Sequence, residues 1–228
     1  MRKMTLDGRL LSVGKFVRQG AQFADIGTDH AYLPIYLLRR GIIEHAVAAD
    51  INEGPLNSAK ENAADMGVSD KIKFFLTDGV QGLENEGLTD IAIAGMGGEL
   101  IADIIDAADF LKDGHLRLIL QPMSKQAHLR RYLANNGFLI TDEKYSSSSS
   151  KFYVTMCVHY SGTIRELDIY EAEFGSRDFL EEITPEARGY LLKKRNSLYK
   201  TAKGRLSGGE AEPEELALCT YIDEILSL

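Results

Sequence analysis

The stretch Ala24–Leu33, Ala-Asp-Ile-Gly-Thr-Asp-His-Ala-Tyr-Leu, limits the possible folds of this chain most strongly. A short apolar run, 23–26, leads into a turn at Gly27, and a helical pattern over 32–40 follows. Strand, tight turn and helix in this order are typical of a nucleotide-binding α/β unit, in which ligands bind at the carboxyl ends of the strands. Gly27 would let the backbone approach a ligand closely, and Asp25 would lie at the end of the strand.

This turn lacks the pattern G-x-G-x-x-G that places a pyrophosphate at a helix N-terminus. Its spacing is Asp25-x-Gly27-x-Asp29-x-Ala31, and its two carboxylates would repel a pyrophosphate. They suit a ligand that carries positive charge, such as the sulfonium and ammonium groups of S-adenosylmethionine (SAM). An ordinary Asp/Gly turn would give the same short pattern, so the motif alone leaves both interpretations open.

Two further acids follow the next predicted strands. Strand 46–51 contains Asp50 near its end, and strand 72–76 is followed by Asp78-Gly79. A carboxylate at the end of the second strand commonly accepts hydrogen bonds from a ribose, and one after the third could meet an adenine amino group. Each acid alone is more often a turn or cap residue. Three acids at successive strand ends favour a ligand site, because these ends converge on one crevice.

Strand 90–94 runs into Gly95-Met96-Gly97-Gly98, ahead of a helix over 99–108. Glycines at this strand end could form a slot through which a flat substrate reaches the cofactor. The alternative is a helix N-terminus whose glycines serve packing. We favour the slot because of its position at the carboxyl end of the strand. The fifth strand, 116–120, ends in Gln121-Pro122, and the Gln121 amide could bind the edge of a base.

Residues 138–141 and 152–158 alternate like a hairpin, and the serine run 146–150 between them predicts a mobile loop. Seven strands are then expected in the first 160 residues, which form one α/β domain. The apolar spacing predicts its helices at 6–17, 32–40, 56–66, 99–108 and 125–136.

Residues 161–228 differ in character. The stretch 187–206 holds seven basic residues and no acid, with apolar residues on a seven-residue rhythm, and a final helix is expected at 214–226. We predict an antiparallel, coiled-coil-like pair of helices with a buried seam and one basic helix. Such a basic stretch in an acidic protein favours contact with phosphates over a solvated face laced by salt bridges.

Composition sets the outer limits. The 228 residues, 44% hydrophobic and 26% charged, give room for one α/β domain and a smaller appendage. Cys157 and Cys219 form no metal or disulfide pattern, so we expect a reducing compartment and no metal. We found no apolar run of membrane-spanning length and no signal-peptide core, so a cytoplasmic protein is expected. The net charge of −8 argues against indiscriminate nucleic-acid binding but not against a local basic face.

Three motifs together resemble the bacterial TrmK family: residues 24–34, Ile-Ala-Gly-Met-Gly-Gly at 93–98 and Leu-Ile-Leu-Gln-Pro at 118–122. TrmK proteins are SAM-dependent methyltransferases that act on N1 of adenine 22 in tRNA. The resemblance implies a Rossmann-like, seven-stranded class I methyltransferase domain at 1–160 and a small helical domain at 161–228. Met123 and Ser150 depart from the family pattern, which often has Asn and Gly at these positions.

The resemblance also implies a cofactor site around Asp25, Gly27, Asp50 and Asp78-Gly79, with Asp29, His30 and the 95–98 loop facing the adenine, whereas the expected contacts of the C-terminal region rest on its charge and periodicity. The expected cofactor site comprises Asp25, Gly27, Thr28, Asp29, His30, Asp50, Ile51, Asn52, Asp78, Gly79, Ala94 and Gly95. The expected adenine and tRNA contacts comprise Tyr32, Met96, Gly97, Gly98, Gln121, Pro122, Arg9, Arg18, Lys193, Lys194 and Arg195. On the sequence of this stretch alone, a solvated helix face is the stronger interpretation of Arg9 and Arg18.

Asp29 and His30 are the catalytic candidates. N1 of neutral adenine carries a lone pair and can attack a methyl group without first losing a proton, so the site needs alignment more than a strong base. Asp29 would act as charge partner of the cationic product or as its proton acceptor. His30 is as readily a hydrogen-bonding turn residue. Because N1 lies on the Watson–Crick edge, the base must be unpaired or flipped out.

Two other functions stay open on the sequence. One is methylation of a small molecule or another RNA, and the other is a non-catalytic RNA-binding module that keeps a SAM fold. Three strand-end acids argue against the second. tRNA is the expected partner, without an obligate protein partner. We expect a monomer, since no exposed apolar stripe is evident in the sequence.

Overall fold

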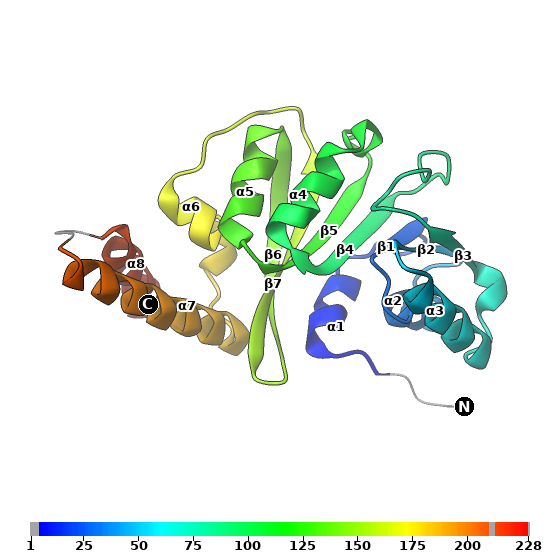
Figure 1. The fold of residues 1–228 in the computed structure, drawn as a ribbon, viewed down its shortest axis with the longest axis horizontal. Helices are drawn as coiled ribbons and strands as arrows, with labels where there is room; N and C mark the ends of the chain where they lie inside the picture. The colour runs from blue at the N-terminus through cyan, green and yellow to red at the C-terminus, as the bar shows by residue number, and fades with distance from the viewer. Residues whose placement is uncertain (1–4, 210–212, 228) are drawn as a thin grey trace.

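A computed structural model of the protein describes residues 5–209 and 213–227 (Figure 1). Its centre is a seven-stranded sheet in the order β3-β2-β1-β4-β5-β7-β6. The strands are β1 Phe23–Ile26, β2 Ala46–Asp50, β3 Ile72–Leu76, β4 Asp90–Gly97, β5 Arg117–Ser124, β6 Phe138–Ser148 and β7 Lys151–Tyr160. The first five are parallel, and β7 is antiparallel to β5 and β6. This order confirms the predicted Rossmann-like sheet, and it places the topological switch point between β1 and β4.

Helices cover both faces of the sheet. Helices α1 (Gly8–Gly14), α2 (Tyr32–Arg39) and α3 (Glu53–Asp65) share one apolar core with the sheet. Helices α4 (Gly98–Asp106) and α5 (Gln126–Asn135) share the other. All four residues of β1 are buried, as expected for a central strand covered on both faces. The sheet therefore presents its ligand site at the strand ends and not on a face.

The β6–β7 hairpin corrects one prediction. Ser146 to Ser148 belong to β6 and pair with Tyr153 to Lys151, so the serine run is mostly strand and not a mobile loop. Only Ser149 and Ser150 form the turn, both left-handed with φ of 48° and 62°. A two-residue turn of this kind matches the twist of the flanking strands, which lets the backbone pairing continue to the tip.

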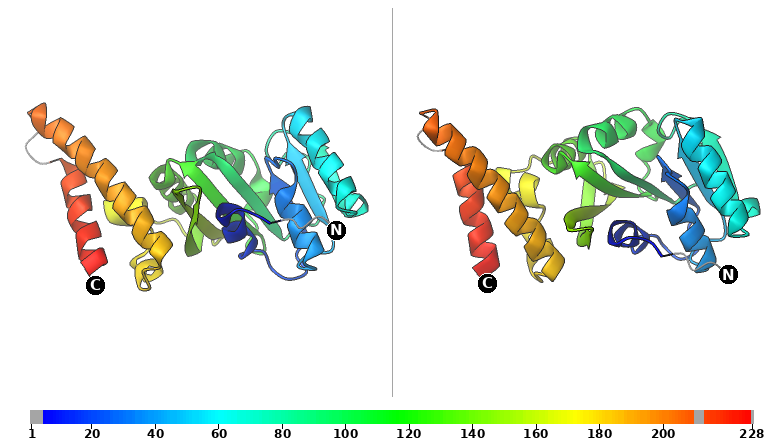
Figure 2. Two further views of the ribbon diagram at one scale, coloured as in Figure 1. Left: turned by 90° about the horizontal axis from the view of Figure 1, so that it is seen from below. Right: turned by 60° about the horizontal axis from the view of Figure 1, so that its bottom comes forward.

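The C-terminal region contains α6 (Ile169–Phe174), a short 3-10 helix η3 (Arg177–Leu180), α7 (Pro185–Ser207) and α8 (Glu214–Ser227). Thr184 caps α7 by accepting the Ala187 N–H, and Pro185 stands in its first turn. Helices α7 and α8 run antiparallel beside the β6–β7 edge, far from α2 and α3 (Figure 2). Two contacts near opposite ends of α7 fix that direction: Arg188 donates to the Leu226 carbonyl, and Arg205 pairs with Glu215.

One face of α7 corrects the expectation that the chain has no exposed apolar stripe. Leu191 and Ala202 are fully buried against α8 and the sheet domain, as the rhythm predicts. Leu192, Tyr199 and Leu206 recur every seven residues on the open side, and 42%, 54% and 43% of their surface is exposed. The seven-residue rhythm therefore leaves these three side chains outside the buried seam.

A buried arginine of the sheet domain, Arg130, connects the two parts of the chain. Arg130 on α5 donates to both Glu143 carboxylate oxygens, at 2.7 and 2.9 Å, and neither side chain is exposed. The remaining guanidinium nitrogen donates to the carbonyls of Ala172 and Glu173 at the end of α6, both at 3.0 Å. Since a buried charge must keep its partners, α6 is fixed to the sheet domain. Among the described helices, none is long and apolar enough to cross a membrane.

Candidate active site

A cavity of about 680 Å³ opens where β1 and β4 end, which is within the usual size of a small-molecule site. We call it the crevice. Seven predicted site residues line it: Arg9, Asp25, Gly27, Asp29, Tyr32, Ala94 and Gly95. Helix α1 closes one side through Arg9 and Leu10. The cavity therefore combines residues from four segments of the sequence, the fourth being α3 with Asn62 and Met66.

The turn after β1 holds an unusual backbone. Gly27 has φ of +70°, and the N–H groups of Gly27 and Thr28 both donate to the Ala49 carbonyl, at 2.8 and 2.9 Å. His30 and Ala31 are also left-handed, with φ of 65° and 52°, although neither is glycine. Such backbone strain is concentrated at ligand sites, where the surrounding structure maintains it.

The side chains of this turn group at the mouth of the crevice. The His30 ring stacks on Tyr32, with ring centres 5.2 Å apart. Asp29 lies 3.1 Å from His30 Nε2, and 78% of the Asp29 side chain is exposed. Asn62 on α3 supports the turn by donating to the His30 carbonyl at 3.1 Å. Sequence reasoning missed Asn62, because a single polar residue inside a helix gives no signal of its contact.

Asp25 is the buried acid of the site, with 7% of its surface exposed. Burial raises the pKa of Asp25 to about 6, although the hydrogen bond from Thr28 Oγ1, at 2.6 Å, and the charge of Arg9 act in the opposite direction. The carboxylate is thus mostly ionised at neutral pH but poorly solvated. A cationic group of a ligand would lower this desolvation cost.

Arg9 belongs to a hydrogen-bond network beside the crevice that the sequence did not predict. Gln121 is completely buried, and its Oε1 accepts from Arg9 Nη1 at 3.1 Å and from the Gly95 N–H at 3.2 Å. Its Nε2 donates to the carbonyl of Pro122. The structure therefore places Gln121 behind the crevice, where it orients Arg9 and the end of β4.

In the glycine segment 95–98, one glycine fits the predicted substrate slot and another serves packing. Gly95 lines the crevice with φ of +82°, at an irregularity in the pairing of β4 with β5. The Met96 side chain lies over Gly27, where a Cβ on that glycine would collide with it. Gly98 has no room for a Cβ because the Lys125 carbonyl lies against it, so this glycine serves packing. Gly97 is the last residue of β4.

The other strand-end acids lie beside the crevice and not in its lining. Asp50 is the last residue of β2 and Asp78 follows β3, and these two strands continue the row of strand ends from β1. Asp50 Oδ1 accepts the Asn52 N–H at 2.8 Å, which orders the turn that contains Ile51. Gly79 has φ of +58° and packs near Ile104. An elongated ligand in the crevice would reach these acids along the row.

The predicted basic residues have different positions. Arg18 lies at the opposite, amino end of β4, where it holds the buried Asp90 through Nε at 2.7 Å and donates to the Thr89 carbonyl. On α7, Lys194 pairs with Glu173 at 2.7 Å and Arg195 pairs with Asp223 at 2.7 Å. Much of the predicted basic set is therefore held in internal ion pairs.

The sheet order and the crevice at its switch point define a Rossmann-like methyltransferase. Residues 6–156 match the family model described as a methyltransferase domain. The chain is 32% identical over 204 residues to the tRNA (adenine(22)-N(1))-methyltransferase of Bacillus subtilis (strain 168), which covers 87% of this chain and 80% of that protein. This protein belongs to the tRNA (adenine(22)-N(1))-methyltransferase family, which confirms the predicted resemblance to TrmK.

Solved structures agree with this assignment. The Bacillus subtilis m1A22 tRNA methyltransferase TrmK has a TM-score of 0.78 at 27% identity and covers 99% of this chain and 98% of its own. A Streptococcus pneumoniae protein, a candidate tRNA (m1A22) methyltransferase crystallised in complex with SAM, has a TM-score of 0.82 at 34% identity. That match covers 96% of this chain and 98% of the Streptococcus chain.

Proposed function

We infer that this protein transfers a methyl group from SAM to N1 of adenine 22 in tRNA. The observation that carries the inference is the buried, ionised Asp25 facing Arg9 across a cavity of ligand size, in a chain of this family. Methylation of a small molecule would use the same cofactor site, but the relatives named above act on tRNA. This makes tRNA the better supported substrate.

The residues of the crevice fit SAM, which supplies an electrophilic methyl group when bound. Its methionine end carries an ammonium and a carboxylate, and the crevice offers Asp25 and Arg9 as charges of opposite sign. We propose that Asp25 binds the ammonium and Arg9 the carboxylate. Asp50 then accepts hydrogen bonds from the ribose hydroxyls, and Asp78 lies near the adenine of the cofactor.

The mouth of the crevice fits a flipped-out adenine. Tyr32 is 42% exposed and already stacked on His30, so the pair offers an aromatic surface on which a base can stack. Asp29 next to this surface would stabilise the positive charge that adenine acquires when N1 is methylated. Alignment of the base by Tyr32 and His30 and charge stabilisation by Asp29 are the roles that we propose for this chain.

The tRNA body requires a second surface, for which we propose α7. Lys194 and Arg195 are held by acids, so we now assign the phosphate contacts to the exposed lysines without an ion-pair partner among the described residues: Lys193, Lys200 and Lys203. Helical geometry places these three on one side of α7, next to the stripe that contains Tyr199. Phosphate contacts from this side would be independent of sequence and sensitive to salt.

The domain boundary at 160/161, a cytoplasmic location and a monomeric state remain proposals. The boundary is supported by the change from sheet to helices after β7, which ends at Tyr160. The location is supported by the tRNA substrate of the relatives. The monomer was expected because the sequence showed no exposed apolar stripe. That reason no longer holds, since α7 exposes such a stripe.

The proposed function is tested by incubating the protein with labelled SAM and an unmodified tRNA transcript that has adenine at position 22. A transcript that differs only by guanine at position 22 is the matched control. The proposal expects label in the first transcript and none in the second. Equal labelling of both transcripts, or of neither, would reject it.

A further inference from the structure

Gln121 is completely buried behind the lining of the crevice. The sequence suggests contact between its amide and the edge of a base, but both polar ends of the side chain are occupied inside the protein. Oε1 accepts two hydrogen bonds, and Nε2 donates to the Pro122 carbonyl at 3.2 Å. Any influence of Gln121 on a bound substrate therefore passes through the groups that it holds.

One oxygen of Gln121 joins two walls of the crevice. Oε1 accepts from Arg9 Nη1 on α1 at 3.1 Å and from the Gly95 N–H on β4 at 3.2 Å. Both partners are donors, so the orientation of the carboxamide is fixed, because a flipped amide would turn its own N–H groups towards them. A Cβ on Gly95 would lie 3.3 Å from Arg9 Nη1, so the two partners approach each other closely.

The bond to Gly95 supports an irregularity of the sheet. The register of β4 against β5 passes from Ala94, which pairs with Gln121, to Met96, which pairs with Pro122, and so skips Gly95. Bulges of this kind re-aim the backbone beside active sites and interrupt the ladder of backbone hydrogen bonds. The Gln121 oxygen satisfies the N–H of the skipped residue, and it thereby fixes the end of β4 where the substrate slot begins.

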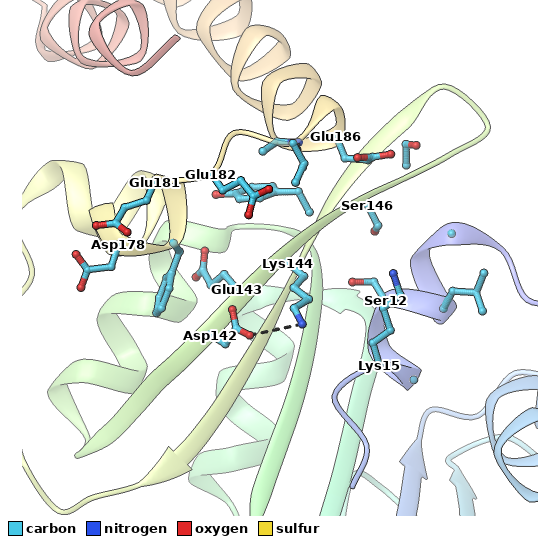
Figure 3. A pocket seen from close by; sticks show the side chains of 18 of the residues that line it. Ser12, Lys15, Asp142, Glu143, Lys144, Ser146, Asp178, Glu181, Glu182 and Glu186 are labelled. Carbon is cyan, nitrogen blue, oxygen red and sulfur yellow. Dashed lines mark hydrogen bonds and ion pairs between the residues drawn. The ribbon is translucent and has the colours of Figure 1, made fainter. Parts of the chain in front are cut away.

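Helix α1 holds the base of the Arg9 side chain in a fixed place. Gly8 lies so close to the Ser147 carbonyl of β6 that a Cβ on this glycine would collide with it. Ser12 and Lys15 line a separate cavity of about 840 Å³ beside β6 (Figure 3), whereas Arg9 lines the crevice. The backbone of α1 is therefore anchored to β6, and the Gln121 oxygen restrains the freedom that remains to the long Arg9 side chain.

Gln121 orients Arg9 without neutralising its charge. Among the described residues, Arg9 forms an ion pair with Asp7, and its distance of 3.9 Å is near the limit of about 4 Å for such pairs. A carboxylate in place of the Gln121 amide would accept the same two hydrogen bonds, but it would also pair with the guanidinium at short range. The neutral amide leaves the positive charge of Arg9 available to an anionic group of a ligand.

We propose that Gln121 is a positioning residue for methyl transfer, which holds the charge of Arg9 and the bulge at Gly95 in one arrangement. This inference rests on the proposed function, in which Arg9 binds the SAM carboxylate. It assigns two separable effects to one side chain. The neutrality of the amide sets the affinity for the SAM carboxylate, whereas its acceptor oxygen sets the geometry of the β4 end and hence the rate of methyl transfer.

The first test is calorimetric titration of SAM and of decarboxylated SAM into the wild-type protein and Gln121→Glu, without tRNA. Decarboxylated SAM keeps the sulfonium and ammonium groups but lacks the carboxylate. Gln121→Glu should bind SAM at least about tenfold more weakly than the wild type, because the new carboxylate pairs with Arg9 and repels that of the cofactor. Its affinity for decarboxylated SAM should not fall. An equal loss for both ligands, or unchanged SAM affinity, would overturn the proposal.

Gln126→Glu is the matched control. Gln126 Nε2 donates to the same Pro122 carbonyl at 3.3 Å, so this variant loses the same kind of hydrogen bond and adds the same charge. That bond involves neither Arg9 nor Gly95, so the variant should bind SAM like the wild type. Thermal unfolding of each variant checks that the fold is kept. A loss of SAM affinity as large as that of Gln121→Glu would reduce the effect to added charge and overturn the proposal.

The second test is single-turnover methylation of the adenine 22 transcript at saturating SAM. Gln121→Glu keeps an acceptor for the Gly95 N–H and should react at nearly the wild-type rate. Gln121→Met loses that acceptor and should be at least about tenfold slower, since a small misplacement of reacting groups is costly. Equal rates of the two variants would overturn the role of the oxygen.

The two proposals fail in different ways. Absence of SAM binding by the wild type would reject the proposed function and this inference together. SAM binding without methylation of adenine 22 would reject the proposed function alone, and the affinities for SAM and decarboxylated SAM would still decide on the role of Gln121.

Discussion

Asp25 gives the most quantitative prediction of the structure. Its pKa of about 6 lies above the ordinary value of 3.8, so the folded state binds this proton more tightly than the unfolded state does. The free energy of unfolding contributed by Asp25 is therefore highest below pH of about 4 and falls as the pH rises towards 6. A shift of about two units corresponds to about 3 kcal/mol lost at neutral pH. The ionised carboxylate is thus retained at a cost to stability.

Asp25→Asn removes that cost and keeps an oxygen that can accept the Thr28 hydroxyl. We expect the variant to match the wild type near pH 4 and to become more stable by about 2–3 kcal/mol by pH 7. Urea unfolding of both proteins between these pH values measures the difference. Glu44→Gln, an exposed acid outside both cavities, is the control and should show no such trend.

The same variant should lose SAM affinity, because the proposed partner of the ammonium becomes neutral. Stability gained and binding lost together are the signature of a strained functional group. A stability difference between Asp25→Asn and wild type that does not change with pH would refute the reasoning about burial. Unchanged SAM affinity would refute the assignment of Asp25 to the cofactor.

Four further variants test the proposed roles, the last of them as a control. Asp50→Ala should weaken SAM binding in calorimetry by about 1.5–3 kcal/mol through loss of a charged acceptor, and an unchanged affinity would reject the ribose contact. Asp29→Ala should lower the single-turnover methylation rate more than tRNA affinity, and equal rates at saturating substrates would reject the charge-partner role. Replacing the three exposed lysines of α7 with alanine should weaken tRNA binding and flatten its salt dependence, whereas Lys194→Ala/Arg195→Ala should keep the salt slope. Identical slopes for both variants would mean that tRNA docks elsewhere.

The sequence alone was enough to predict the sheet and one part of the candidate site. Strand-end acids and Gly27 follow from local rules, since parallel strands bring their carboxyl ends to one edge. The buried Asp25 and the left-handed Gly27 therefore lie in the crevice where the pattern predicts them. The same rules predict the antiparallel direction of α7 and α8, because a short connection joins two apolar seams.

Contacts between segments far apart in the sequence could not be predicted from the sequence alone. Arg9 and Gln121 are 112 residues apart, and Arg18 and Asp90 are 72 apart, so no local period relates the members of either pair. Arg195 likewise looked free, because its partner Asp223 belongs to the next helix. A charge pattern on one helix predicts where basic residues gather, but the neighbouring helix decides which of them stay available for phosphates.

The proposed activity places the methyl group on N1 of adenine 22. The most direct measurement is mass spectrometry of nucleosides and of the fragment that contains position 22, after one turnover of the wild-type protein on an unmodified tRNA transcript. The expected result is one added methyl group, recovered as 1-methyladenosine and located at position 22. A methyl group on N6 of adenine, at another position or on another nucleotide would contradict it.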